Sequence, residues 1–421
     1  MTRIFLIIIF ALVWDTDLSA QRLIYGTVRD QETKQPLAFA TIGLKGLSFG
    51  TISNSQGEFT LRIPKNLTDS IIVVSYLGYK SKEIAVSFKD QINVELTPHQ
   101  IQLDELVIRP LSPTDYIKKA VKKYPDNYPS NPFQTKAYYR EKFLENGNVV
   151  HISEGVFKSY YPSFQDTLKN QHQLLLFRQA DDIYDIAFMN DWIEKKEAKK
   201  KKKALKKGKE YEETNITNEI REGFGGPETI LGIDLTKNEE PCLDSTLFKK
   251  FRYSFANGVS YQERQLLVIN FETKGKVDHT RQKGQIFIDI QTDAIVALEY
   301  SGVLVVPAFI RPILFVFGLE IENPTFEKKV KYQLVDELWY PENFQWFVNL
   351  QIKKKYIFKK NEKSRFYGEQ VLKVNQANTT NPMEIPEDKR FDAEKPMNDQ
   401  QYPDDETTWN NVNALKLEER P

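Results

Sequence analysis

The chain has 421 residues, in which 58 lysines and arginines balance 58 aspartates and glutamates. This balance excludes a globally basic nucleic-acid-binding protein, and we expect no nucleic acid among the partners. The single cysteine, Cys242, excludes an intramolecular disulfide framework and any multi-cysteine metal site. Apolar residues make up 40% of the chain and aromatic residues 12%, which is typical of a folded protein rich in β-structure.

The first residues carry the pattern of an export signal. Arg3 precedes the apolar run Ile4–Trp14, and the small residue Ala20 stands directly before Gln21. This pattern predicts a signal peptide over residues 1–20. A membrane anchor is the alternative, but a helix of that run would span only about 16 Å, short of a hydrocarbon core. We therefore expect an exported protein, in the periplasm or on the periplasmic face of the outer membrane.

Residues 22–98 alternate short strand-like runs with turn residues. Glu58–Ile63 alternates polar and apolar side chains with period two, which predicts a half-buried strand. Ser53–Gly57 before it predicts a turn, because Asn and Gly tolerate positive φ. Several such strands without helical periodicity predict a small β-sandwich.

Five motifs in this span occur in a recognisable order. They are Tyr25–Asp30, Pro36–Ile42, Gly50–Asn54, Gly57–Phe59 and Ser75–Tyr79, and the segment Leu103–Ile108 follows them. Together they resemble the carboxypeptidase regulatory-like domain, a transthyretin-like β-sandwich that precedes SusC-type TonB-dependent receptors in bacterial envelopes. The resemblance implies a module without a zinc site, in a protein whose partners are envelope proteins, outer-membrane transport components among them.

Residues 99–130 predict a linker with one short helix. Pro113 suits the start of that helix, and Tyr116, Ile117 and Ala120 follow at helical spacing. Residues 131–375 predict a larger antiparallel β-rich domain with a few helices. Eight strands are expected there, at Gln134–Phe143, Val149–Phe157, Phe251–Ala256, Leu266–Thr273, Gly284–Ile290, Ala294–Tyr300, Lys328–Val335 and Phe344–Phe358. In architecture, the hairpins and the Trp339-Tyr340-Pro341 turn are similar to the open barrel of lipoprotein carriers.

A basic insertion over residues 194–210 interrupts these strands, inside a helix predicted over Ile183–Lys207. Its consecutive lysines are Lys199, Lys200, Lys201, Lys202 and Lys203. One interpretation is contact with an anionic lipid surface or another polyanion. The other is a solvated insertion, which the lack of interleaved aromatic residues favours.

The apolar segment 303–319 is the second interruption. Pro307 and Pro312 argue against one continuous element, and Arg311 between them argues against a membrane-spanning helix. The remaining interpretations are a buried hairpin, the wall of a ligand cavity, and a loop that touches a membrane or a partner. Burial in the core is the simplest of these. The candidate contact residues are Val305, Phe309, Arg311, Phe315 and Phe317.

The C-terminal residues 376–421 are polar, acidic and rich in proline, and they predict a disordered tail. Metal chemistry receives little support. His151, Glu154 and the distant His279 have a spacing that zinc peptidases use, but His151 and Glu154 lie on a predicted strand and point to opposite faces. We therefore expect no metal, no cofactor and no catalytic residue.

The sequence favours a non-enzymatic protein of the periplasm or outer membrane, a binding or scaffold protein beside envelope transport or assembly machinery. The alternative is a periplasmic carrier that shields a lipid or other apolar ligand in an open barrel. A hydrolase is the third and weakest hypothesis. An apolar cavity in the second domain would favour the carrier, and polar residues converging in a cleft would favour an enzyme.

Overall fold

The computed structural model describes residues 21–47, 49–64, 67, 70–85, 90–101, 111–163, 170–180, 184, 187–188, 190–206, 230–238, 240–306, 311–316, 318–358, 360–393, 395, 397–403, 409 and 411–416. The predicted signal peptide, residues 1–20, lies outside this part of the chain. Two compact units are present. One comprises Met1–Tyr76, Lys80–Pro98 and Thr407–Pro421, and the other comprises Leu77–Tyr79 and His99–Glu406.

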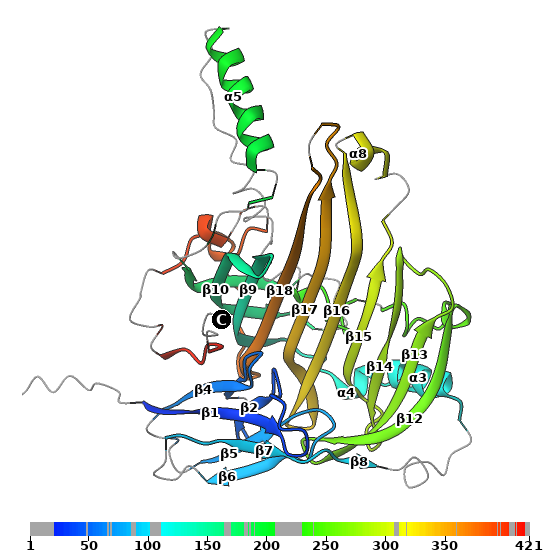
Figure 1. Cartoon of the computed structure of the whole chain (residues 1–421). Helices are drawn as coiled ribbons and strands as arrows, with labels where there is room; N and C mark the ends of the chain where they lie inside the picture. Colours follow the sequence, from blue (N-terminus) through cyan, green and yellow to red (C-terminus); the bar gives the residue numbers. More distant parts are fainter. Residues whose placement is uncertain are drawn as a thin grey trace, which may run out of the picture. The chain divides into compact units, whose positions relative to one another are not determined.

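The N-terminal unit is built from two small sheets (Figure 1). The first has the order β4 (Glu58–Ile63), β1 (Arg22–Asp30), β7 (Val94–Leu96), and the second has the order β3 (Gly50–Ile52), β2 (Thr41–Leu44), β5 (Ile71–Ser75), β6 (Lys82–Ala85). Strand β4 buries Phe59, Leu61 and Ile63 and leaves the residues between them half-buried, as its alternation predicts. Gly57 before it has a φ of +76°, which confirms the predicted turn. The predicted β-sandwich is confirmed.

The second unit contains one open antiparallel sheet of eleven strands in the part of the chain that the structure describes. The strand order is β11 (Gln171–Gln179), β10 (Asn148–Tyr161), β9 (Phe133–Glu145), β18 (Glu362–Asn378), β17 (Leu338–Lys354), β16 (Leu319–Val335), β15 (Ile295–Leu304), β14 (Thr280–Asp289), β13 (Arg264–Thr273), β12 (Phe251–Tyr261) and β8 (Gln100–Ile101). The predicted β-rich domain is therefore confirmed, and β11 and β8 are the edge strands of its open sheet.

A few short helices accompany this sheet. The α-helices are α3 (Pro113–Lys122), α4 (Tyr124–Asn127), α5 (Asn190–Lys206) and α8 (Arg311–Val316), and the 3-10 helices are η2 (Phe248–Lys250), η3 (Glu387–Lys389) and η4 (Met397–Asp399). The side chain of Ser112 accepts a hydrogen bond from the backbone N–H of Asp115 and caps α3, which begins at the expected Pro113. Among the described residues, no helix combines the length and the apolar character that crossing a membrane requires.

One face of the sheet is apolar and forms the core of the second unit. Directly paired residues on six neighbouring strands are at most 1% exposed on this face: Ile269, Ile286, Leu298, Val330, Phe344 and Leu372. Helix α3 covers this face, since the rings of Tyr116 and Phe255 lie 5.8 Å apart in an edge-to-face contact. Figure 1 shows α3 beside β12 to β14. The opposite face of the sheet carries the polar side chains.

The C-terminal tail differs from the predicted disorder of residues 376–421. Strand β18 continues to Asn378, and the backbone N–H of Phe391 donates a 2.7 Å hydrogen bond to the carbonyl of His172 on β11. Phe391 and Met397 are buried in the second unit, and Val412 and Leu415 are buried in the N-terminal unit. The apolar residues of the tail are few and widely spaced, so the composition of the tail does not reveal them. Phe391 and Met397 nevertheless lie beside the edge strand β11, and Val412 lies beside the edge strand β4.

Candidate binding groove and exposed tip

The polar face of the sheet follows directly from strand register. Side chains alternate between the two faces along each strand, and paired residues on neighbouring strands share a face. One polar row crosses six strands through the paired residues Glu272, Lys283, Ser301, Glu327, Phe347 and Glu369. A second row runs beside it through Asn270, Gln285, Glu299, Lys329 and Gln345. The sheet therefore presents a broad polar face opposite its apolar core.

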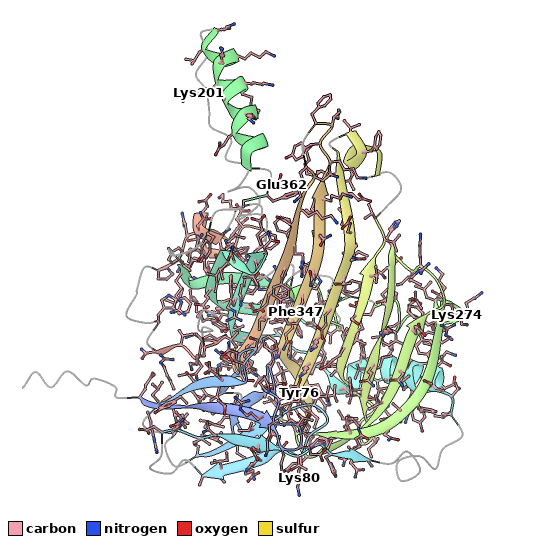
Figure 2. The ribbon with its side chains drawn as sticks, in the orientation of Figure 1. Tyr76, Lys80, Lys201, Lys274, Phe347 and Glu362 are labelled. Carbon is pink, nitrogen blue, oxygen red and sulfur yellow. The ribbon has the colours of Figure 1, made fainter. Side chains whose placement is uncertain are left out.

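Two adjoining hollows lie on this polar face, and we call them together the groove. Their volumes are about 700 Å³ and 1050 Å³, and both are lined by Glu272, Lys274, Lys283, Ser301 and Glu327. The first hollow extends over β17 and β18, and the second extends over β12. In Figure 2, Phe347 lies against the middle strands of the sheet and Lys274 lies toward its β12 side.

Most charges around the groove are paired. Arg252 of β12 lies 3.1 Å from Glu272 of β13, and Lys331 of β16 lies 3.6 Å from Glu299 of β15, whereas Lys329 and Glu327 pair at 2.8 Å along β16 itself. Arg281 and Lys283, which also line the groove, form no ion pair with the residues that the structure describes. The groove thus offers positive charge to a ligand. Its polar residues are spread over several strands rather than gathered around a single point.

An aromatic pair closes one side of the groove. The rings of Phe347 and Tyr367 lie 6.4 Å apart and only 21° from parallel. The hydroxyl of Tyr367 donates to a carboxylate oxygen of Glu369 at 3.2 Å, and Glu369 lies 2.5 Å from Arg140 in a fully buried ion pair. Because Glu369 is held by Arg140, its hydrogen bond fixes the position of the Tyr367 ring. The aromatic pair is therefore a rigid part of the groove wall.

Two buried amides continue the polar face beyond the groove. Asn343 and Gln345 are both 1% exposed. Gln345 lies two residues before the groove residue Phe347 on β17, so the two side chains share a face of the sheet. Neither the oxygen nor the nitrogen of either amide has a hydrogen-bond partner among the described residues. A buried polar group without a partner is rare and costly, so an enclosed water molecule beside these amides would be stabilising.

Burial also lowers the pKa of one lysine of the sheet, Lys373. Lys373 is buried beside Glu342, at 3.3 Å, and Tyr261 donates a hydrogen bond to the same carboxylate. Removal from water lowers the pKa of Lys373, although the negative charge of Glu342 opposes the shift.

The His151 region does not assemble a metal site in the described structure. The imidazole of His151 lies 3.0 Å from Glu141 and 3.2 Å from Ser153, whereas Glu154 pairs with Arg178 and accepts a hydrogen bond from Tyr138. His151 and Glu154 therefore serve separate polar clusters on opposite faces of β10. Among the residues that the structure describes, no group of three or more His, Cys, Asp and Glu side chains could hold a metal ion.

The candidate residues of segment 303–319 are only partly described. Phe309 and Phe317 lie outside the described residues, Val305 is half-buried, and Arg311 begins α8. Phe315 is 84% exposed and its neighbour Val316 is 79% exposed. Burial in the core is therefore wrong for Phe315 and Val316, which lie on α8 directly before β16 and face solvent. The lysines Lys199, Lys200, Lys201, Lys202 and Lys203 are exposed on α5.

The comparisons with known proteins concern mainly the N-terminal unit. Residues 24–108 match the model of the CarboxypepD_reg-like domain. The TonB-dependent receptor SusC of Bacteroides thetaiotaomicron is 34% identical over 109 residues, which is 26% of this chain and 10% of the receptor. The TonB-dependent receptor P3 of Formosa agariphila is 31% identical over 88 residues, which is 21% of this chain and 9% of that receptor. The chain thus spans a small fraction of the curated relatives that it matches.

These matches define the class of the N-terminal unit. It contains a CarboxypepD_reg-like domain and resembles the N-terminal region of SusC-type TonB-dependent receptors, as the sequence motifs predict. Among solved structures, a DUF1329 family protein from Desulfovibrio piger is 8% identical with a TM-score of 0.23, and the alignment covers 65% of this chain and 96% of that one. A likeness of this size supports no functional argument.

Proposed function

We propose that the protein is a non-enzymatic binding or scaffold protein of the cell envelope, associated with the periplasm or the outer membrane. It acts beside envelope transport or assembly machinery and holds a polar partner in the groove of its large sheet. The observation that carries this proposal is the groove itself, a hollow of mixed charged and aromatic lining that spans several paired strands. Within the described part of the chain, it contains positive charge at Arg281 and Lys283 that no carboxylate neutralises through an ion pair.

The arrangement of charges in the groove adds support to a binding role. The groove charges pair with each other across strands, as in Arg252 with Glu272, which suits recognition over an extended surface.

The N-terminal unit supports the envelope setting. Its relatives are named as TonB-dependent receptors, and residues 24–108 match the CarboxypepD_reg-like domain. The predicted signal peptide agrees with this setting. A role beside transport machinery follows as a proposal from this shared module.

The lipid-carrier alternative receives less support. The groove is lined by charged and amide side chains such as Glu272, Lys283 and Asn349, and an acyl chain placed against them would desolvate charges without replacing their partners. A polar or charged partner meets no such cost.

A steric block tests the proposal. Ser301 lines both hollows, so Ser301→Trp fills the groove without removing a charge. Affinity purification from envelope fractions of the native cells, with proteins and lipids both quantified, should show loss of a specific polar partner. Met383→Trp is the matched control, since Met383 is 66% exposed and does not line either hollow. Equal retention by wild type and both variants would refute groove binding.

A further inference from the structure

Three long strands extend beyond the rest of the large sheet as a finger. Pairing between β15 and β16 ends at Val303 with Thr325, but β16 continues to Leu319, where it pairs with Lys354 of β17. On the other side, pairing between β18 and β9 ends at Phe366 with Glu145. Strand β16 thus runs six residues past its last partner on β15, or about 20 Å. Figure 1 shows these strands reaching past their neighbours, with α8 at their end.

Backbone hydrogen bonds join two segments at the end of the finger. Gly318 donates to the carbonyl of Phe315 at 2.9 Å, and Lys355 donates to the carbonyl of Gly318 at 2.7 Å. Helix α8 and the turn after β17 are therefore immediate neighbours. Gly318 has a φ of +63°, a conformation that glycine adopts readily, and this allows the sharp return from α8 into β16.

The two joined segments expose the largest apolar side chains of the finger. Phe315 and Val316 on α8 are 84% and 79% exposed, and Ile357 and Phe358 in the turn are 90% and 96% exposed. We call these four residues the apolar tip. Scattered exposed apolar residues are ordinary, but four adjacent ones at the end of a projecting structure mark an interaction surface.

Lysines outnumber acidic residues beside the apolar tip. The described residues of 353–363 include five lysines, namely Lys353, Lys354, Lys355, Lys360 and Lys363, and a single acid, Glu362. Figure 2 places Glu362 at this end of the sheet. Lys353 and Lys355 lie 3.7 Å and 2.8 Å from Glu320, Lys363 lies 3.1 Å from Glu322, and Lys354 is buried. Lys360 is exposed and forms no ion pair with the described residues, so the five lysines outnumber Glu320, Glu322 and Glu362 by two.

We infer that the apolar tip inserts into the interface of an anionic lipid bilayer. Four apolar side chains would enter the boundary between headgroups and acyl chains. The exposed lysines Lys355, Lys360 and Lys363 would contact anionic headgroups while their aliphatic stems lie against apolar surface. The charge around the tip selects this occupant over a second copy of the chain, whose tip would bring the same positive charge. The paired β16, β17 and β18 hold the tip away from the groove, so the two surfaces act separately.

Vesicle co-sedimentation tests this inference with the full mature chain. Wild type should bind vesicles that contain phosphatidylglycerol and should bind phosphatidylcholine vesicles much more weakly. Phe358→Asp and Phe315→Asp should each lower binding to the anionic vesicles roughly tenfold, because an acid replaces an inserted ring. Met383→Asp is the control, since it makes the same change at an exposed apolar residue outside the tip. Equal binding by all four proteins would overturn the inference.

A spectroscopic measurement separates insertion from simple adhesion. Cys242 is 1% exposed, and burial raises the pKa of its thiol, so a dye directed at thiolates spares it. An environment-sensitive dye on the Phe358→Cys variant should shift to the blue with anionic vesicles, while the same dye on the Met383→Cys variant should not. A dye at position 358 that stays fully aqueous in vesicle-bound protein would contradict insertion. Sedimentation velocity would reveal a dimer of the wild-type protein. A dimer that dissociates in the Phe358→Asp variant would place the tip in a contact between two copies and would also overturn the inference.

Discussion

The side chain of Asn413 is hydrogen-bonded to the backbone of Arg62 in both directions. The backbone N–H of Arg62 donates to the Asn413 side-chain oxygen at 2.7 Å, and the Asn413 amide donates to the Arg62 carbonyl at 3.3 Å. Arg62 lies on β4, an edge strand of the N-terminal unit. The amide of Asn413 thus takes the place of a neighbouring strand, and a residue from the far end of the chain satisfies an edge that would otherwise be open.

Asn413→Ala should therefore destabilise the N-terminal unit. The substitution leaves a donor and an acceptor of β4 without partners, and we expect a loss of about 1–3 kcal/mol in the free energy of unfolding. Urea denaturation followed by circular dichroism would measure it. Asn411→Ala is the control, because Asn411 is exposed in the same segment. Equal stability of the two variants would remove the assigned role of Asn413.

Two glycines separate the effect of backbone conformation from the effect of packing. Gly57 and Gly46 have φ values of +76° and +73°, but a Cβ at Gly57 would lie 2.5 Å from the carbonyl oxygen of Val28, whereas a Cβ at Gly46 meets nothing within 4 Å. Gly46→Ala should cost about 1–2 kcal/mol from the positive φ alone. Gly57→Ala should cost clearly more, since backbone must also move. Thermal melts of both variants test this, and a Gly57 variant as stable as the Gly46 variant would contradict it.

The buried ion pair of Arg140 and Glu369 should be costly to break. Both side chains are at most 3% exposed, so Glu369→Leu leaves an unpaired buried guanidinium and should lower stability by about 3–5 kcal/mol. The double variant Arg140→Met with Glu369→Leu should recover much of this loss. At the exposed pair of Arg252 and Glu272, Glu272→Gln should cost less than about 1 kcal/mol. Chemical denaturation that gives similar losses at both pairs would contradict this ranking.

His172 should make stability depend on pH. Burial lowers its pKa from 6.5 to about 4, because the protonated ring would be desolvated, and its Nδ1 lies 2.8 Å from the hydroxyl of Ser159. The unfolded chain binds the proton more readily, so the contribution of His172 is fully present above pH 6.5 and is lost as pH falls toward 4. The loss should reach about 3 kcal/mol. His172→Gln should flatten this slope in denaturation curves collected across that range, and an unchanged slope would refute the assignment.

The fold can be predicted from the sequence where a strand shows alternating polar and apolar residues within its own length. Glu58–Ile63 alternates in sequence and alternates in burial, and Asn146 with Gly147 forms a turn at positive φ. Strands β11 and β18 carry no such signal in the sequence. On β18 the charged residues Lys363 and Arg365 face away from the core, and the polar residues after them are buried by the sheet, so local composition resembles a loop.

The candidate surfaces differ in how far sequence could reveal them. The apolar segment that contains Phe315 is visible in composition, although only the structure joins it to Ile357 and Phe358. The groove has no local motif, because Glu272 and Glu327 belong to strands that are far apart in the chain. Strand register alone brings them together, and a shift by one residue would move each of them to the apolar face.

Site-specific photo-crosslinking tests the central claim, that the groove is the binding surface, most directly. A photo-reactive phenylalanine analogue at Gln285, an exposed residue that lines the groove, and at Met383 as the control would be introduced into the chain in its native cells. We expect a defined adduct from residue 285 that is absent from residue 383 and is lost when Ser301→Trp fills the groove. Adducts of equal yield from both positions, or an adduct at 285 that survives the filled groove, would contradict it.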